Sequence, residues 1–185
     1  MRQETKVFTY YKFSELSDKA KENAVNNLYY INVYHDWWEF IYEDAENIGL
    51  KITGFDIGRN NYCTGEWLAK YSCNEVANKI LAQHGEMCET YKIAKEYLME
   101  QTSLVAKYSD GKNLEIVAED NEYDYDNEIE EIENEFLKSL LCEYLTMLRN
   151  ECEYLTSKQG IIEIIEANDC EFDENGKMAY GITWK

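Results

Sequence analysis

Residues 126–155, "DNEIEEIENEFLKSLLCEYLTMLRNECEYL", decide the fold because they carry one apolar stripe over about thirty positions. The apolar residues recur at steps of three and four, and they are Ile129, Ile132, Phe136, Leu140, Leu141, Tyr144, Leu145, Leu148, Cys152 and Leu155. This spacing places them on one face of an α-helix. We therefore predict one long amphipathic helix at about 126–156, roughly 45 Å long at 1.5 Å per residue.

An acidic run leads into this helix. Residues 119–135, "EDNEYDYDNEIEEIENE", hold ten Asp or Glu residues and no Lys or Arg. The wider acidic segment, 113–137, holds eleven acids, which is more than half of the net charge of −19. Acids in a first helical turn complement the helix dipole, at about 0.3–1 kcal/mol each, but that explains only two or three of them. The rest predict a surface that attracts basic proteins and repels nucleic acid and phospholipid.

Helix caps and apolar spacing predict further helices along the chain. The first helix should begin at Ser14 or Ser17, and the second should extend from Asp36 to Gly49. The third should begin at Ser72, with Glu75 three positions later. The fourth should cover 86–108, and the fifth should extend from Ser157 to Asn168.

Strands are predicted from β-branched and aromatic runs bounded by turn residues. The expected strands are 7–13, 50–58, 62–71 with a bulge at Gly65, and 113–119, and Asn175-Gly176 is the strongest hairpin signal. The resulting fold class is α+β, with a small, mostly antiparallel sheet packed with several helices. The chain has no proline and no repeat, so we expect a single domain over 1–185.

Several classes of protein are excluded by composition and motifs. No apolar run approaches the roughly 20 residues of a membrane span, and the N-terminus shows no signal-peptide core. The six cysteines lack CxxC pairing, so a reducing, cytoplasmic location in a bacterial host is expected. No nucleotide-binding, GxSxG or HExxH motif occurs. We expect neither an enzyme nor a cofactor.

Acidic residues, histidines and cysteines suggest two candidate metal sites and one candidate nucleophile. An EF-hand frame is matched at Asp120, Glu122, Asp124, Asp126, Glu128 and Glu131. However, Tyr125 stands where the calcium loop needs glycine, so chance matching in an acidic run is the preferred reading. His84 and Cys88 have helical spacing but no second ligand pair, so we predict no zinc. Cys63 or Cys88 beside His84 remains an alternative nucleophile, with core cysteine preferred.

The densest aromatic cluster, "YYINVYHDWWEFIY", occupies 29–42. We assign Trp37, Phe40 and Ile41 to the core. Tyr34 and Trp38 are candidate exposed anchors, because tyrosine and tryptophan are enriched at interaction hot spots. With the acidic run, the predicted partner-binding residues are Asp120, Glu122, Asp124, Asp126, Glu128, Glu130, Glu131, Glu133, Tyr34 and Trp38.

Both ends of the chain resemble a family of small proteins encoded by phages and mobile elements of Firmicutes and gut bacteria, loosely labelled antitoxin-like. The resemblance is carried by Phe13, Glu15, Leu16, Ser17, Ala20, Lys21 and Ala24, by Trp37, Tyr42, Glu43 and Asp44, and by Leu155, Ser157, Ile161, Glu166, Asn168, Phe172 and Gly176. The middle of the chain is not covered. Some small acidic proteins from this setting are anti-CRISPR inhibitors of Cas9, and no catalytic residue carries over.

The resemblance and the focused charge together imply a counter-defence protein. We expect it to bind a basic effector, Cas9 or its guide-RNA complex, through an acidic surface that mimics DNA. Cas9 holds nucleic acid in positively charged channels. We expect the carboxylates to approach the charge density of duplex DNA, whose phosphates lie about 1.7 Å apart along the axis. The alternative is an antitoxin or regulatory binder of a basic protein, and a metal-dependent or thiol enzyme is the third hypothesis. The sequence does not specify the partner or the oligomeric state.

Overall fold

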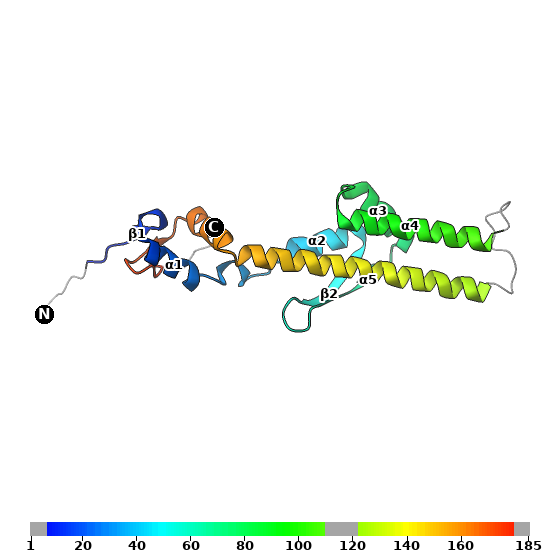
Figure 1. The fold of residues 1–185 in the computed structure, drawn as a ribbon, viewed down its shortest axis with the longest axis horizontal. Helices are drawn as coiled ribbons and strands as arrows, with labels where there is room; N and C mark the ends of the chain where they lie inside the picture. The colour runs from blue at the N-terminus through cyan, green and yellow to red at the C-terminus, as the bar shows by residue number, and fades with distance from the viewer. Residues whose placement is uncertain (1–6, 110–121, 180–185) are drawn as a thin grey trace. The chain divides into compact units, whose positions relative to one another are not determined.

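A computed structural model describes residues 7–109 and 122–179 of the chain (Figure 1). The α+β class is confirmed: in these two ranges, six α-helices accompany four strands in two antiparallel pairs. The residues fall into two compact units. Unit 1 comprises Met1–Trp37 and Asn150–Lys185, and unit 2 comprises Trp38–Arg149. The expectation of a single domain over 1–185 stays a prediction, and each unit is taken separately below.

Unit 1 is built around two short helices and one short strand pair. Helix α1, Asp18–Asn27, begins after Ser17, and α6, Lys158–Ala167, begins after Ser157. Each serine side chain accepts a hydrogen bond from a backbone N–H in the first turn, as the sequence predicted. Strand β1, Tyr11–Lys12, pairs with β4, Glu171–Phe172. The buried residues of this unit are Phe13, Leu16, Ala20, Ala24, Val25, Ile161, Ile165, Cys170 and Phe172.

The predicted turn at Asn175-Gly176 is present and packs directly on α1. Asp173 Oδ1 accepts hydrogen bonds from the backbone N–H groups of Asn175 and Lys177, at 2.9 Å each. Gly176 has φ +83°, and a Cβ atom built there would lie 2.0 Å from the carbonyl oxygen of Ala20. Only glycine allows both this backbone conformation and this close approach.

Unit 2 begins with a helix and a β-hairpin. Helix α2, Glu39–Ile48, ends at Gly49 in the left-handed conformation, as predicted. Strands β2, Leu50–Asp56, and β3, Tyr62–Trp67, pair antiparallel with a register shift between Ile52 and Gly54. The irregularity expected at Gly65 therefore lies in the partner strand, opposite that residue.

Three more helices complete unit 2. Helix α3, Cys73–Gln83, starts with the predicted capping box of Ser72 and Glu75. Helix α4, Glu89–Tyr108, lies beside the long helix α5, Glu122–Leu155 (Figure 1). The boundary between the units falls inside α5, after Arg149.

The apolar stripe of α5 packs as its spacing predicted. Phe136, Leu140, Tyr144 and Leu148 are buried, and Phe136 stacks on Tyr97 of α4 with ring centroids 4.3 Å apart. Further along, Ile129 and Ile132 are half-buried. They are therefore the outer end of the stripe rather than its centre.

Some expected elements differ in the structure. Of the strand expected at 7–13, only Tyr11–Lys12 is paired, because the chain turns into a 3-10 helix at Phe13. The strands form two separate pairs rather than one sheet. Phe40 was wrongly assigned to the core and is 53 % exposed. The strand expected at 113–119 lies within 110–121, outside the described residues. None of the described helices is both long and apolar enough to span a bilayer.

Candidate partner-binding surface

The carboxylates of α5 lie on both flanks of its apolar stripe. Residues four or seven positions apart share a helical face, so Asp124 aligns with Glu131, and Asp126 with Glu130. All four side chains are exposed, and within 7–109 and 122–179 none has an ion-pair partner. These four residues, two on each side of the stripe, are together called the acidic face below.

Glu128 belongs to the predicted set, but its carboxylate is bound by residues of α4. Its Oε2 and Oε1 accept hydrogen bonds from Lys107 Nζ, at 2.7 and 2.6 Å, and Oε1 also accepts one from the Tyr108 hydroxyl at 2.8 Å. The Lys107 ammonium, together with the Tyr108 hydroxyl, lowers the pKa of Glu128. Tyr108 in turn contacts Tyr125 edge-to-face. Glu128 therefore fastens α5 to α4.

Glu133 is also turned inward. It is half-buried and lies beside Cys73, the first residue of α3. Burial raises the pKa of the Cys73 thiol to about 12, and the Glu133 carboxylate adds to the rise. Glu135, which was not in the predicted set, pairs with Lys138 at 3.1 Å.

The structure sets the charge density of this part of α5. Seven carboxylates lie between Asp124 and Glu135, and Lys107 and Lys138 neutralise two of them. The segment is about 17 Å long at 1.5 Å per residue, which leaves one net charge per roughly 3 Å. That is close to the phosphate spacing of one nucleic-acid strand, about 3.4 Å, and half the density of the duplex. The expected match to duplex density is therefore corrected to a match to a single strand.

Two predicted acids cannot be placed in full. Asp120 lies outside the described residues, and Glu122 is the first residue of α5.

The two predicted aromatic anchors differ in exposure. Tyr34 follows the 3-10 turn Ile31–Val33 in unit 1 and is 76 % exposed. Trp38 precedes α2 in unit 2, is half-buried, and contacts Phe55 edge-to-face at 5.6 Å. Tyr34 thus has the accessibility of an anchor, whereas much of Trp38 is used in packing.

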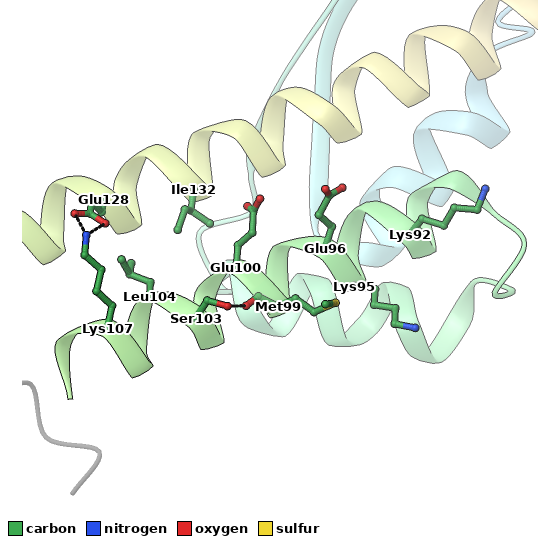
Figure 2. Close-up of a pocket in the computed structure, with 10 residues that line it drawn as sticks. All are labelled: Lys92, Lys95, Glu96, Met99, Glu100, Ser103, Leu104, Lys107, Glu128 and Ile132. Carbon is green, nitrogen blue, oxygen red and sulfur yellow. Dashed lines mark hydrogen bonds and ion pairs between the residues drawn. The ribbon is translucent and has the colours of Figure 1, made fainter. Parts of the chain in front are cut away.

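A groove of about 820 Å³ runs along α4 beside the acidic helix (Figure 2). Met99, Leu104 and Ile132 supply its apolar surface, and Glu96 and Glu100 line it from α4. Sequence reasoning missed this site. The sequence pattern that could have indicated it is on α4, where the lining residues recur every three or four positions from Lys92 to Lys107. They include charged residues and one methionine.

A polar network crosses the interior of unit 2. The Tyr144 hydroxyl donates to Asp44 Oδ2 at 2.8 Å, and His84 Nε2 lies 3.7 Å from Asp44 Oδ1. On the other side of its ring, His84 Nδ1 is 2.7 Å from Oγ1 of the buried Thr90. Burial and the nearby Asp44 carboxylate raise the pKa of Tyr144. The network ties α2, α4, α5 and the end of α3 together.

This geometry bears on the thiol alternatives. Both ring nitrogens of His84 face oxygen atoms, not a cysteine sulfur. Burial raises the pKa of Cys63 to about 11, so its thiol is protonated at neutral pH. Neither observation supports a thiolate nucleophile at Cys63 or a His84–Cys88 zinc pair.

The part of the EF-hand frame that the structure describes, from Glu122 onward, is not a loop. Residues from Glu122 onward are helical, so Asp124 and Asp126 project from different sides of α5. Glu128 is held by Lys107 instead. Among the described residues, no group of three or more metal-ligating side chains converges.

No family model matches the chain, and no curated protein or solved structure is significantly similar to it.

Proposed function

We propose that this chain is a counter-defence protein of phage or mobile-element type that inhibits a nucleic-acid-binding effector such as Cas9. The observation that carries the proposal is the acidic face of α5, whose four exposed carboxylates have no ion-pair partner in the described part of the chain. Charges left unpaired on a rigid helix create a strong local field that attracts a basic groove. The resemblance at the two ends of the chain adds the phage setting.

The charge spacing suggests which channel the protein would occupy. One net charge per roughly 3 Å resembles one strand more closely than a duplex. Cas9-type effectors hold a displaced single strand as well as the guide heteroduplex in basic channels. The proposed inhibitor therefore competes with single-stranded DNA more effectively than with duplex DNA.

The test compares two variants of equal charge in a Cas9 cleavage and DNA-binding assay. The face-neutralised variant carries Asp126→Asn, Glu130→Gln and Glu131→Gln. The matched control neutralises three exposed carboxylates of unit 1, namely Glu22→Gln, Glu166→Gln and Glu174→Gln. The wild-type chain and the control should inhibit, and the face-neutralised variant should lose at least tenfold in affinity.

Salt and order of addition sharpen the test. Binding should weaken between about 0.15 and 0.5 M salt, because the screening length shrinks over this range. Effector already bound to DNA should resist the inhibitor. A stable ternary complex of chain, effector and target DNA would overturn the mimicry, and absence of any inhibition by the folded chain would overturn the Cas9 assignment. Binding to another basic protein through the same face would then favour the antitoxin alternative.

A further inference from the structure

We propose that the groove between α4 and α5 is a docking site for a basic amphipathic α-helix of the partner. In this arrangement, an apolar side chain of the partner helix contacts Met99. Lys or Arg residues one turn apart on that helix face Glu96 and Glu100. The inference rests on the proposed function in one respect only, which is that the partner is basic.

The dimensions of the groove fit a helix. Its lining residues on α4 extend from Lys92 to Lys107. At 1.5 Å per residue this is about 22 Å, or four helical turns. Opposite them, Glu128 and Ile132 are the lining residues that the described part of α5 contributes (Figure 2). Among the described residues, the rest of this face of α4 is therefore available to a third helix.

Met99 gives this face an apolar centre. Its side chain is 63 % exposed, although α4 is otherwise well packed through Ala94, Tyr97 and Leu104. Met99 also borders a second, smaller groove of about 410 Å³ beside Leu98. It is thus a ridge with hollows on both sides. A flexible thioether in that position suits a helix-binding surface that adapts to the partner side chain.

The charges beside Met99 select a basic partner. Glu96 and Glu100 are exposed, lie one turn apart, and have no ion-pair partner among the described residues. In the view of Figure 2 both rise from α4 on the side of α5, whereas Lys95 points away from α5. Lys107 is already paired with Glu128, and Lys92 with Glu89. The middle of the groove therefore presents unneutralised carboxylates.

The same charges argue against a second copy of this chain in the groove. Each copy carries a net charge of −19 and would bring acidic α4–α5 surfaces together. Like charges placed opposite each other across an interface oppose association.

The probe is a synthetic amphipathic peptide of about 18 residues, long enough to span the groove as a helix. Its leucines follow one helical stripe and its arginines flank that stripe. A second peptide of identical composition has the stripe scrambled. Affinities are measured by fluorescence anisotropy with the full chain. The chain should bind the amphipathic peptide at least tenfold more tightly than the scrambled peptide, and equal affinities would overturn the inference, because charge alone would then explain binding.

Matched variants locate the contact. Met99→Ala should weaken peptide binding about tenfold, whereas Met87→Ala, at the other highly exposed methionine, should leave it unchanged. Glu96→Gln with Glu100→Gln should weaken it about tenfold, whereas Glu43→Gln with Glu46→Gln on α2 should not. Unchanged affinity in either groove variant would overturn the proposal.

Methionine methyl spectra supply a readout that needs no variant. The chain has five methionines, so ¹³C-methyl labelling gives few signals. Only the Met99 signal should move strongly when the peptide is added, and movement of Met87 or Met178 alone would overturn the inference. Dimerisation that Met99→Ala abolishes would also overturn it, because a second copy would then fill the groove. A shift of the Met99 signal in the free protein after replacing Leu114, Ile116 and Val117 with serine would overturn it as well. The chain's own apolar residues would then be the occupant of the groove.

The two proposals fail separately. Peptide binding at Met99 without Cas9 inhibition would remove the effector assignment and keep the docking site. Cas9 inhibition that depends on the acidic face but not on Met99 would remove the docking site and keep the proposed function.

Discussion

Neutralising the acidic face should stabilise the protein, because its carboxylates repel one another. The face-neutralised variant, Asp126→Asn with Glu130→Gln and Glu131→Gln, removes five like-charge pairs at helical spacing, namely Glu122–Asp126, Asp126–Glu130, Glu128–Glu131, Glu130–Glu133 and Glu131–Glu135. Lys107 and Lys138 already offset the charges of Glu128 and Glu135, so three of these pairs count in full. Each such pair costs an isolated helix about 0.2–0.5 kcal/mol. The expected gain in the free energy of unfolding is therefore about 1 kcal/mol, or roughly 2–4 °C in Tm for a chain of this size. Asp124 is left in place because its position in the first turn complements the helix dipole.

Urea unfolding followed by far-UV circular dichroism measures this gain, and salt separates its cause. The charges in each pair lie about 6 Å apart, and the screening length falls from about 10 Å at 0.1 M to 3 Å at 1 M. At 1 M salt, the gain in the free energy of unfolding should therefore be about a quarter of the gain at 0.1 M. A loss of about 1 kcal/mol or more on neutralisation would refute the reasoning, because the carboxylates would then be stabilising the fold. A salt-independent gain would show that repulsion is not its source.

Three further predictions concern single residues. Gly176→Ala should lower the free energy of unfolding of unit 1 by about 2–3 kcal/mol, since it combines a positive φ with a clash against Ala20. Thermal unfolding measures this loss. Gly85→Ala is the control, because its Cβ atom would meet nothing closer than 4.0 Å. Tyr144→Phe should cost about 1 kcal/mol in urea unfolding by removing a buried donor to a half-exposed carboxylate, and an unchanged midpoint would contradict this role. The lowered pKa of Glu128 gives a stabilising contribution that is complete above its unfolded pKa and is lost as pH falls through the folded value, so Glu128→Gln should flatten the decline of stability measured between about pH 5 and pH 3.

Local sequence patterns were sufficient for most elements. Ser17, Ser72 and Ser157 begin helices where their side chains can satisfy free backbone N–H groups, and Gly49 ends one in a conformation that glycine tolerates. The apolar stripe of α5 was predictable because a helix repeats every 3.6 residues. These features depend on neighbours a few positions apart, so the sequence alone determined them, along with the α+β class and the concentration of charge on one helix.

Contacts between distant residues were decided only by the tertiary structure. Of the strand expected at 7–13, only Tyr11–Lys12 meets a partner, and that partner, Glu171–Phe172, lies near the other end of the sequence. Phe40 is as apolar as a core residue, but the core of unit 2 forms on another face of α2, through Ile41, Ala45 and Ile48.

The candidate site divides in the same way. The sequence located the carboxylates, but only packing against α4 and α3 shows that Glu128 and Glu133 are engaged internally, whereas Asp126 and Glu130 have no ion-pair partner in 7–109 and 122–179. The groove around Met99 exists because two helices lie side by side, and no local pattern specifies that pairing. Burial and ion pairing are properties of the assembled helices, whereas helical periodicity and charge density belong to the chain itself.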